Sequence, residues 1–146
     1  MAGAIENFGG VEMAGAAGNE VVLRFRDGNL TRCLLTREFT PLDFVVEAET
    51  PEGESVHAKI AELKAVFFLK EPRRREAELQ LGTMVGDPPV GAPTRVEFFD
   101  GEVIHGRVQE YRMEDSGFFL YPTSPESNNE MVFVVARAIN TLSLEG

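Results

Sequence analysis

Hydrophobic and polar residues alternate in short runs along most of this chain, which is the pattern of β-strands with one buried face. In the first run, Val21, Leu23 and Phe25 fall on one side, and Arg24 and Arg26 fall on the other. β-Branched and aromatic residues, which pleated strands favour, fill the later runs. The pattern predicts strands at residues 21–26, 30–39, 43–49, 54–60, 65–70, 95–99, 102–112, 117–122, 130–136 and 139–144.

The last five of these strands repeat the pattern of the first five. Asp27-Gly28 matches Asp100-Gly101 at an offset of 73 residues, and both pairs predict tight hairpin turns because glycine accepts a positive φ. Phe44 matches Phe118 at an offset of 74. On the final strand of each set the offset is 75, and the matched pairs are Phe67 with Leu142 and Leu69 with Leu144. A repeat of this length predicts two structural modules in tandem.

The expected fold class is mainly β, with two tandem small five-stranded barrels of the SH3-like kind. Modules of about 50 residues bury only about 60% of their unfolded surface, so each should be stabilised by packing against the other or against a partner chain. Residues 73–81 are read as either a short helix or an edge strand, and the Pro- and Gly-rich stretch after them is typical of a linker. The predicted division is a flexible N-terminal arm at 1–18, module 1 at 19–71, a linker at 72–92 and module 2 at 93–146.

The two copies differ on the outer face of the last strand, which is apolar in the first module and polar in the second. The residues compared are Val66 and Phe68 against Thr141 and Ser143 and, at the first hairpin, Phe99 against Arg26. Exposed apolar area of this kind marks an interface. We therefore expect Val66, Phe68 and Phe99 to be covered by the other module or by a second chain, with cover from the chain's own linker as the alternative.

The charge balance bears on the partners that the protein can have. The net charge is −10, from 24 acidic and 14 basic residues, which repels phosphate backbones and disfavours general nucleic-acid binding. No apolar run is long enough to span a membrane, and the N-terminus lacks the features of a signal peptide, so a cytoplasmic protein is expected.

Few side chains are candidates for chemistry. His57 and His105 do not occupy matching positions and have no other His or Cys nearby, so neither is read as a metal ligand. Cys33 stands where the second module has Gly106, a bend position that requires a small residue, and is read as a buried, inert thiol. The cationic run of Arg73, Arg74 and Arg75 is a candidate anion or ligand patch, but the acids that follow it favour an ordinary helix or linker surface.

Some of these features also form a family pattern. Asp100-Gly101 is followed by Gly106 at the bend of the second strand, and the first module has Asp27-Gly28 with Cys33 at the bend. Residues 56–69 (VHAKIAELKAVFFL) read as a strand, a short turn and a final strand. This order resembles the Sm and Sm-like family, which includes the bacterial host-factor RNA chaperones. The resemblance covers both modules, and it implies small barrels that assemble by pairing edge strands and a bacterial source.

The RNA-reading motifs of that family are not reproduced. Its loop after the second strand carries an Asn, which is absent from residues 40–43 and 113–117, and its second motif is absent from residues 62–64 and 137–139. The resemblance therefore implies the fold without RNA binding. PilZ barrels, which bind a cyclic dinucleotide, are a weaker match. Their motif requires two arginines spaced by three residues, whereas the arginines at 73–75 are consecutive and no arginine follows them at that spacing.

These observations favour a non-enzymatic adaptor or regulatory module that docks unidentified protein partners and also forms homo-oligomers, such as a dimer or a ring. No catalytic triad, metal set, phosphate loop or cofactor fingerprint is present, so no catalytic residue, metal or cofactor is predicted. The alternative is RNA or nucleotide-ligand binding on an Sm-like or PilZ-like barrel. Its basic groove would comprise Arg24, Arg26, Arg32, Arg37 and the run at 73–75.

Overall fold

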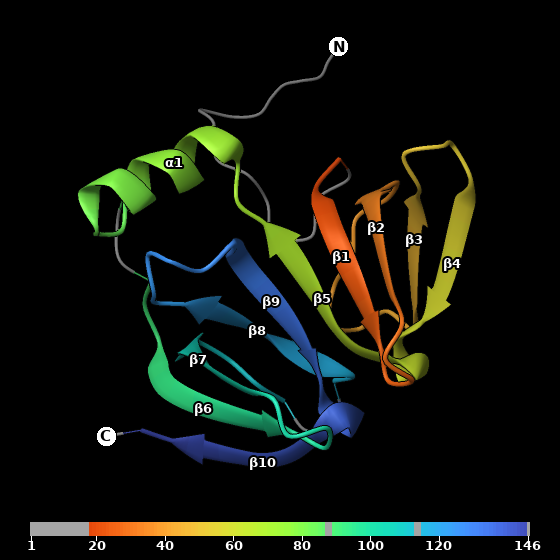
Figure 1. The fold of residues 1–146 in the computed structure, drawn as a ribbon. Coiled ribbons are helices and arrows are strands. Elements are labelled where there is room, and N and C mark those ends of the chain that lie inside the picture. The colour runs from red at the N-terminus through yellow and green to blue at the C-terminus, as the bar shows by residue number, and fades with distance from the viewer. Residues whose placement is uncertain (1–17, 87–88, 113–114, 146) are drawn as a thin grey trace.

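The strands of the described residues form one antiparallel sheet, and one α-helix of the same residues lies beside it (Figure 1). The computed structural model describes residues 18–86, 89–112 and 115–145, so the N-terminal arm predicted for residues 1–18 lies outside the described part except for Gly18. The first five strands are β1 (Glu20–Phe25), β2 (Leu30–Leu35), β3 (Val45–Glu49), β4 (Ser55–Lys59) and β5 (Leu63–Leu69). The others are β6 (Ala92–Phe98), β7 (Val103–Val108), β8 (Gly117–Pro122), β9 (Asn129–Val135) and β10 (Ile139–Leu144).

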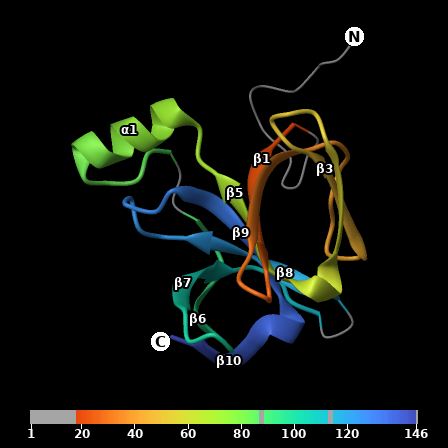
Figure 2. The same cartoon turned by 45° about the vertical axis from the view of Figure 1, so that its right-hand side comes forward.

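The sheet order is β10-β6-β7-β8-β9-β5-β1-β2-β3-β4, which joins two five-stranded halves through β5 and β9. In both views these two strands lie side by side between the halves (Figures 1 and 2). This arrangement corrects the prediction of two tandem five-stranded barrels. Among the described residues no pairing joins β4 to β5 or β9 to β10, so neither half closes on itself and the strands continue as one sheet.

Both predicted Asp-Gly turns are present, and each connects the first two strands of its half. Gly28 has φ 97° and donates its backbone N–H to Phe25 O, and Gly101 has φ 94° and donates to Phe98 O. Gly106 meets a different demand, because a Cβ there would lie 2.4 Å from Leu120 Cδ2. A residue without a side chain therefore lets β7 approach β8 closely.

The pairing of the fifth strands corrects the predicted alignment by one residue. Leu23 pairs with Val66, and Val96, which lies 73 residues after Leu23, pairs with Leu142. Val66 is therefore the counterpart of Leu142, whereas the sequence alignment gave that place to Phe67. A slip of one residue exchanges the two faces of a strand.

The corrected faces show how β5 serves both halves. Val66 and Phe68 belong to the first core, and Ala65 and Phe67 belong to the second core. The residues of β10 that correspond to Ala65 and Phe67 are Thr141 and Ser143. The outer face of β5 is thus apolar because the second half covers it, and the same face of β10 is polar.

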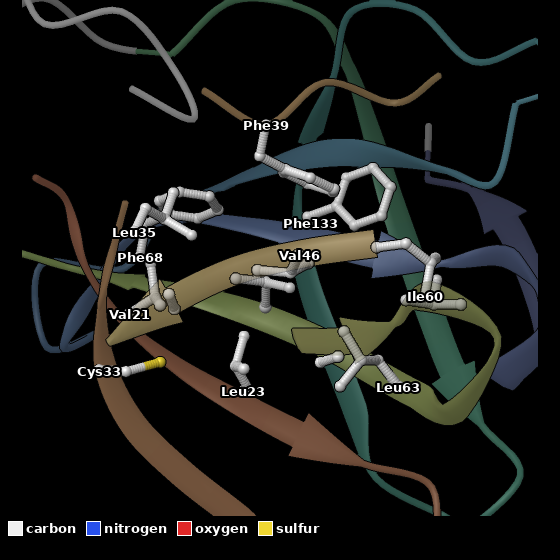
Figure 3. Packing of buried hydrophobic residues seen from close by; sticks show 14 of the residues in the cluster. Val21, Leu23, Cys33, Leu35, Phe39, Val46, Ile60, Leu63, Phe68 and Phe133 are labelled. Carbon is white, nitrogen blue, oxygen red and sulfur yellow. The ribbon is translucent and has the colours of Figure 1, made fainter. Parts of the chain in front are cut away.

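The two cores also share β9, whose side chains alternate between them. Met131, Phe133 and Val135 complete the first core, while Val132 and Val134 lie in the second. Figure 3 shows Phe133 and Phe68 converging with side chains of the first half on one apolar interior. Strands buried on both faces have continuous apolar runs, as β5 has at residues 65–69 and β9 has at residues 131–135.

A buried lysine adds a polar link between the halves. Lys64 of β5 is 4% exposed, and its Nζ donates to Asp100 Oδ2 at 2.7 Å and also to Glu102 Oε1. The same ammonium group lies 4.7 Å from the centre of the Phe98 ring. The hydrogen bond from Lys64, followed by that from the backbone N–H of Glu102, holds the pKa of Asp100 below its usual value.

Residues 73–81, predicted as a helix or an edge strand, are helical and belong to α1 (Pro72–Leu81). Proline at the first turn and left-handed Gly82 at the end are typical helix boundaries. The helix is held by Glu78, which is fully buried and accepts hydrogen bonds from Lys70 Nζ and Arg74 Nε. Burial would raise the pKa of Glu78, but the hydrogen bonds from Lys70, the Val85 N–H and Arg74 lower it to about 2.

Candidate functional site

A pocket with a volume of about 570 Å³ opens where the two halves of the sheet meet. It lies between the short 3₁₀ turns η3 (Ile60–Glu62) and η4 (Ala136–Ala138), each of which precedes the last strand of its half. The first half contributes Phe44, Val45, Lys59, Ile60 and Ala61. The second half contributes Asp115, Ser116, Val135, Ala136 and Arg137.

Backbone hydrogen bonds fix the two sides of this pocket in the same way. Ile60 donates its N–H to Phe44 O at 2.8 Å, and Ala136 donates its N–H to Ser116 O at 2.9 Å. The residue before β3 and the residue before β8 are therefore each tied to the 3₁₀ turn of their own half. Phe44 and Ser116 are consequently structural counterparts, which corrects the predicted match of Phe44 with Phe118.

Ser116 also ties the second half to the loop before β3. Its Oγ donates to Pro41 O at 2.9 Å and to Asp43 O at 3.3 Å, and its backbone N–H donates to Pro41 O at 3.2 Å. Asp43 in turn accepts a hydrogen bond from the Thr40 N–H. The walls of the pocket are thus held by contacts between the halves, so the cavity is largely formed before any ligand arrives.

The apolar part of the pocket has a buried floor and an exposed edge. Ile60 and Val135 are 3% and 1% exposed and form the floor. Phe44 is 81% exposed and Val45 is 40% exposed. Leu42, which lies close by in the chain, is 72% exposed. Exposed apolar side chains in a pocket lining, as Phe44 and Val45 are, are typical of a binding surface.

Three polar side chains of the pocket lack the ion-pair or hydrogen-bond partners that such groups usually have. Lys59 and Arg137 are exposed, and neither makes an ion pair with any of the residues that the structure describes. Asp115 Oδ1 is buried and lacks a hydrogen-bond partner within the described part of the chain. A buried acceptor without a donor costs about 1–3 kcal/mol, so a ligand that supplies a donor would recover that energy.

The three predicted interface residues have different surroundings. Val66 is completely buried and Phe68 is 3% exposed, and they pair with Phe133 and Met131 of β9. Both side chains face the first core, so they are not on the outer face predicted for them. Phe99, at the turn between β6 and β7, is 68% exposed and is not covered by either half.

The predicted arginine patch is largely engaged within the chain. Arg74 NH1 donates to Glu130 at 2.9 Å in addition to the contact of its Nε with Glu78, and Arg75 Nε donates to Asn128. These contacts dock α1 against the β8–β9 region. Only Arg73 of the three is without a charged or hydrogen-bonding partner among the described residues.

The two histidines and the cysteine lie apart from one another. His105 Nδ1 is 3.0 Å from Glu145 Oε1, and exposed His57 lies 3.9 Å from Glu47. Cys33 is buried in the first core, and burial raises the pKa of its thiol to about 11. Within residues 18–86, 89–112 and 115–145, no three His, Cys, Asp or Glu side chains cluster as metal ligands would. No helix in that part of the chain has the length and apolar character required to cross a bilayer.

The pocket was not apparent from the sequence because the two copies were matched in the wrong register at Phe44. The repeat pattern matched Phe44 with Phe118. Aligned correctly, an aromatic residue in the first half stands against Ser116 in the second, and that contrast was the available signal.

Taken together, these features define a mainly β protein with a preformed pocket between two halves of one sheet. The chain belongs to the family of unknown function DUF6982, whose model matches residues 17–146. No curated protein and no solved structure matches the chain significantly.

Proposed function

We propose that this protein is a non-enzymatic interaction module that docks a segment of a partner protein in the pocket between its two halves. The observation that carries the proposal is the pair of exposed apolar side chains, Phe44 and Val45, in the lining of that pocket. Water-exposed aromatic side chains beside a cavity are typical anchors of protein interfaces.

The size and position of the pocket support binding. Ligand pockets commonly have volumes of about 300–1,000 Å³ and lie at junctions between structural units, with mostly apolar walls and a few polar groups. The pocket described here has a volume of about 570 Å³ and draws its lining from both halves. A partner that fills it would contact both halves at once.

The polar groups in the pocket suit recognition better than catalysis. Ser116, the one hydroxyl among the described lining residues, already donates to two backbone carbonyls, and those residues include no histidine or cysteine to serve as base or nucleophile. Lys59 and Arg137 can attract a charged group, and Asp115 can accept a hydrogen bond.

We also infer that the halves descend from one duplicated five-stranded unit of the Sm-like kind. What supports this is the matching strand order of the halves, β5-β1-β2-β3-β4 and β10-β6-β7-β8-β9. Equivalent backbone hydrogen bonds recur in both, such as Arg26 N–H to Glu62 O and Phe99 N–H to Ala138 O. On this view the pocket lies between two copies of one unit that have diverged at their meeting point.

A second candidate function is the binding of RNA or a nucleotide. The arrangement of exposed Phe44 beside Lys59 and Arg137 favours it, because an aromatic face stacks on a base and cations attract phosphate. The net charge of −10 opposes it for long nucleic acids.

The proposal is tested by comparing Phe44→Ser with Phe99→Ser. Both substitutions remove a strongly exposed aromatic ring, and only Phe44 lines the pocket. The tagged wild-type chain and both variants are used to capture proteins from cells that make the protein, with quantitative mass spectrometry. We expect a partner that is retained by the wild type and Phe99→Ser and lost with Phe44→Ser. Equal capture by all three chains would contradict docking at the pocket.

A further inference from the structure

We propose that the pocket recognises an extended peptide segment in which a carboxylate side chain stands beside an apolar one. This inference rests on the proposed function and names the chemistry of the docked segment. Three features of the structure carry it: unpaired cations, an unpaired buried acceptor and a free strand edge that ends in the pocket.

The cations of the pocket are exceptional within this chain. Of the 14 Lys and Arg side chains, all lie in the described residues, and all but Lys59, Arg73 and Arg137 make a hydrogen bond or ion pair there. Two of these three line the same pocket. In a protein with an excess of acids, two cations without a carboxylate partner in the described residues leave a local positive site, which is complementary to a carboxylate of the ligand.

The buried acceptor calls for a donor from the ligand. Asp115 lines the pocket, and its buried Oδ1 has no partner among the described residues. A carboxylate ligand alone would meet Asp115 with like charge, so the ligand must also carry an N–H or O–H group. A peptide backbone supplies an N–H at every residue except proline, within a few ångströms of its side chains.

The free edge of β4 favours an extended peptide over a compact small molecule. β4 ends the sheet, so the outer edge of Ser55–Lys59 has no neighbouring strand among the described residues. Lys59, the last residue of this strand, lines the pocket, and so do Ile60 and Ala61 after it. A peptide that pairs with this edge would run directly into the pocket, which is the β-addition mode of recognition.

The apolar part of the pocket lining then determines which kind of side chain stands next to the carboxylate in the bound peptide. Side chains alternate along an extended peptide, so a carboxylate that reaches Lys59 and Arg137 places adjacent residues on the opposite side. Phe44, Val45 and Ile60 offer an apolar surface to an aliphatic or aromatic side chain at such a position. The recognised pattern is therefore acidic and apolar residues close together in a strand-forming segment.

The test selects peptides from a phage-displayed library of random 12-residue sequences on the full-length protein. The selected peptides are then synthesised, and their affinities are measured for four chains: wild type, Lys59→Glu/Arg137→Glu, Phe44→Ser and Phe99→Ser. All substituted side chains are exposed or partly exposed, and circular dichroism verifies that each variant folds. We expect selected peptides to contain Asp or Glu beside an apolar residue. Their affinity should fall at least about tenfold in the charge-reversed and Phe44→Ser chains and stay unchanged in Phe99→Ser.

Other outcomes separate the inference from the function on which it rests. Selected peptides without acidic residues that still lose affinity in Phe44→Ser would overturn the acidic class and leave the docking function standing. Peptides whose affinity is unchanged in both pocket variants, or no selected peptides at all, would overturn both. A single-stranded RNA 12-mer that binds in place of peptides, or self-association that Lys59→Glu/Arg137→Glu abolishes, would also overturn the peptide assignment.

Discussion

Replacing Phe68 with serine tests how the halves of the sheet hold each other. The ring of Phe68 is 3% exposed and lies 6.2 Å from that of Phe119 in an edge-to-face arrangement, and its strand pairs with β9 at Met131. Truncating a buried phenylalanine costs about 3–5 kcal/mol. A serine hydroxyl left without a partner in an apolar core adds about 1–3 kcal/mol.

We therefore expect Phe68→Ser to lower the free energy of unfolding by at least about 4 kcal/mol, a large part of the roughly 5–15 kcal/mol of a typical domain. The measurement is urea denaturation followed by circular dichroism, with linear extrapolation to water. The matched control is Leu144→Ser, because Leu144 holds the corresponding position on β10 and is 76% exposed. The control should change the free energy of unfolding by no more than about 0.5 kcal/mol.

The same variant distinguishes cover by the chain itself from cover by a second chain. Because Phe68 is buried within the core of its own molecule, the mass measured by light scattering at low temperature should equal that of the wild type. A change in mass together with a loss of less than about 1 kcal/mol would refute this reasoning, because it would place Phe68 between two molecules.

Three further predictions concern buried polar and thiol groups. Glu78→Gln leaves the buried ammonium of Lys70 without its charged partner, so unfolding in urea should show a loss of about 3–5 kcal/mol. Because the pKa of Glu78 is lowered in the folded state from 4.5 to about 2, its contribution is fully present above pH 4.5 and is lost as the pH falls toward 2. An acid titration of wild type and Glu78→Gln should therefore show the two stabilities converging over that range. Cys33, whose pKa is raised to about 11, should react with a thiol reagent at pH 8 far more slowly than a free cysteine, until urea unfolds the chain.

The sequence predicted most of the strands and failed where side chains are buried on both faces. The first hairpins were predictable because Asp-Gly at 27–28 and 100–101 fixes a turn by local geometry. In β5 the run Ala65 to Leu69 is apolar throughout, so no alternation reveals which residues face which core. The alignment of Phe67 with Leu142 was therefore open to a slip of one residue, and the structure shows that the slip occurred.

The junction pocket was unpredictable for a related reason. It depends on which strand of the second half pairs with β5, and nothing local to residues 63–69 identifies β9 as that strand. The contact of Ser116 with Pro41 likewise joins residues that are 75 positions apart. Residues 73–81, by contrast, were ambiguous only between a helix and an edge strand, and Pro72 and Gly82 at the two ends of α1 are the local signals that favour the helix.

The sharing of β5 between both cores has a consequence for synthesis on the ribosome. β5 ends at Leu69, and its partner β9 is complete only at Val135. At about 5–20 residues per second, the intervening chain takes on the order of 3–13 seconds to make. During that interval the nascent first half presents an apolar strand edge with no partner. An unpaired edge of this kind is a site for chaperone binding or for aggregation between nascent chains, until β9 emerges and closes it.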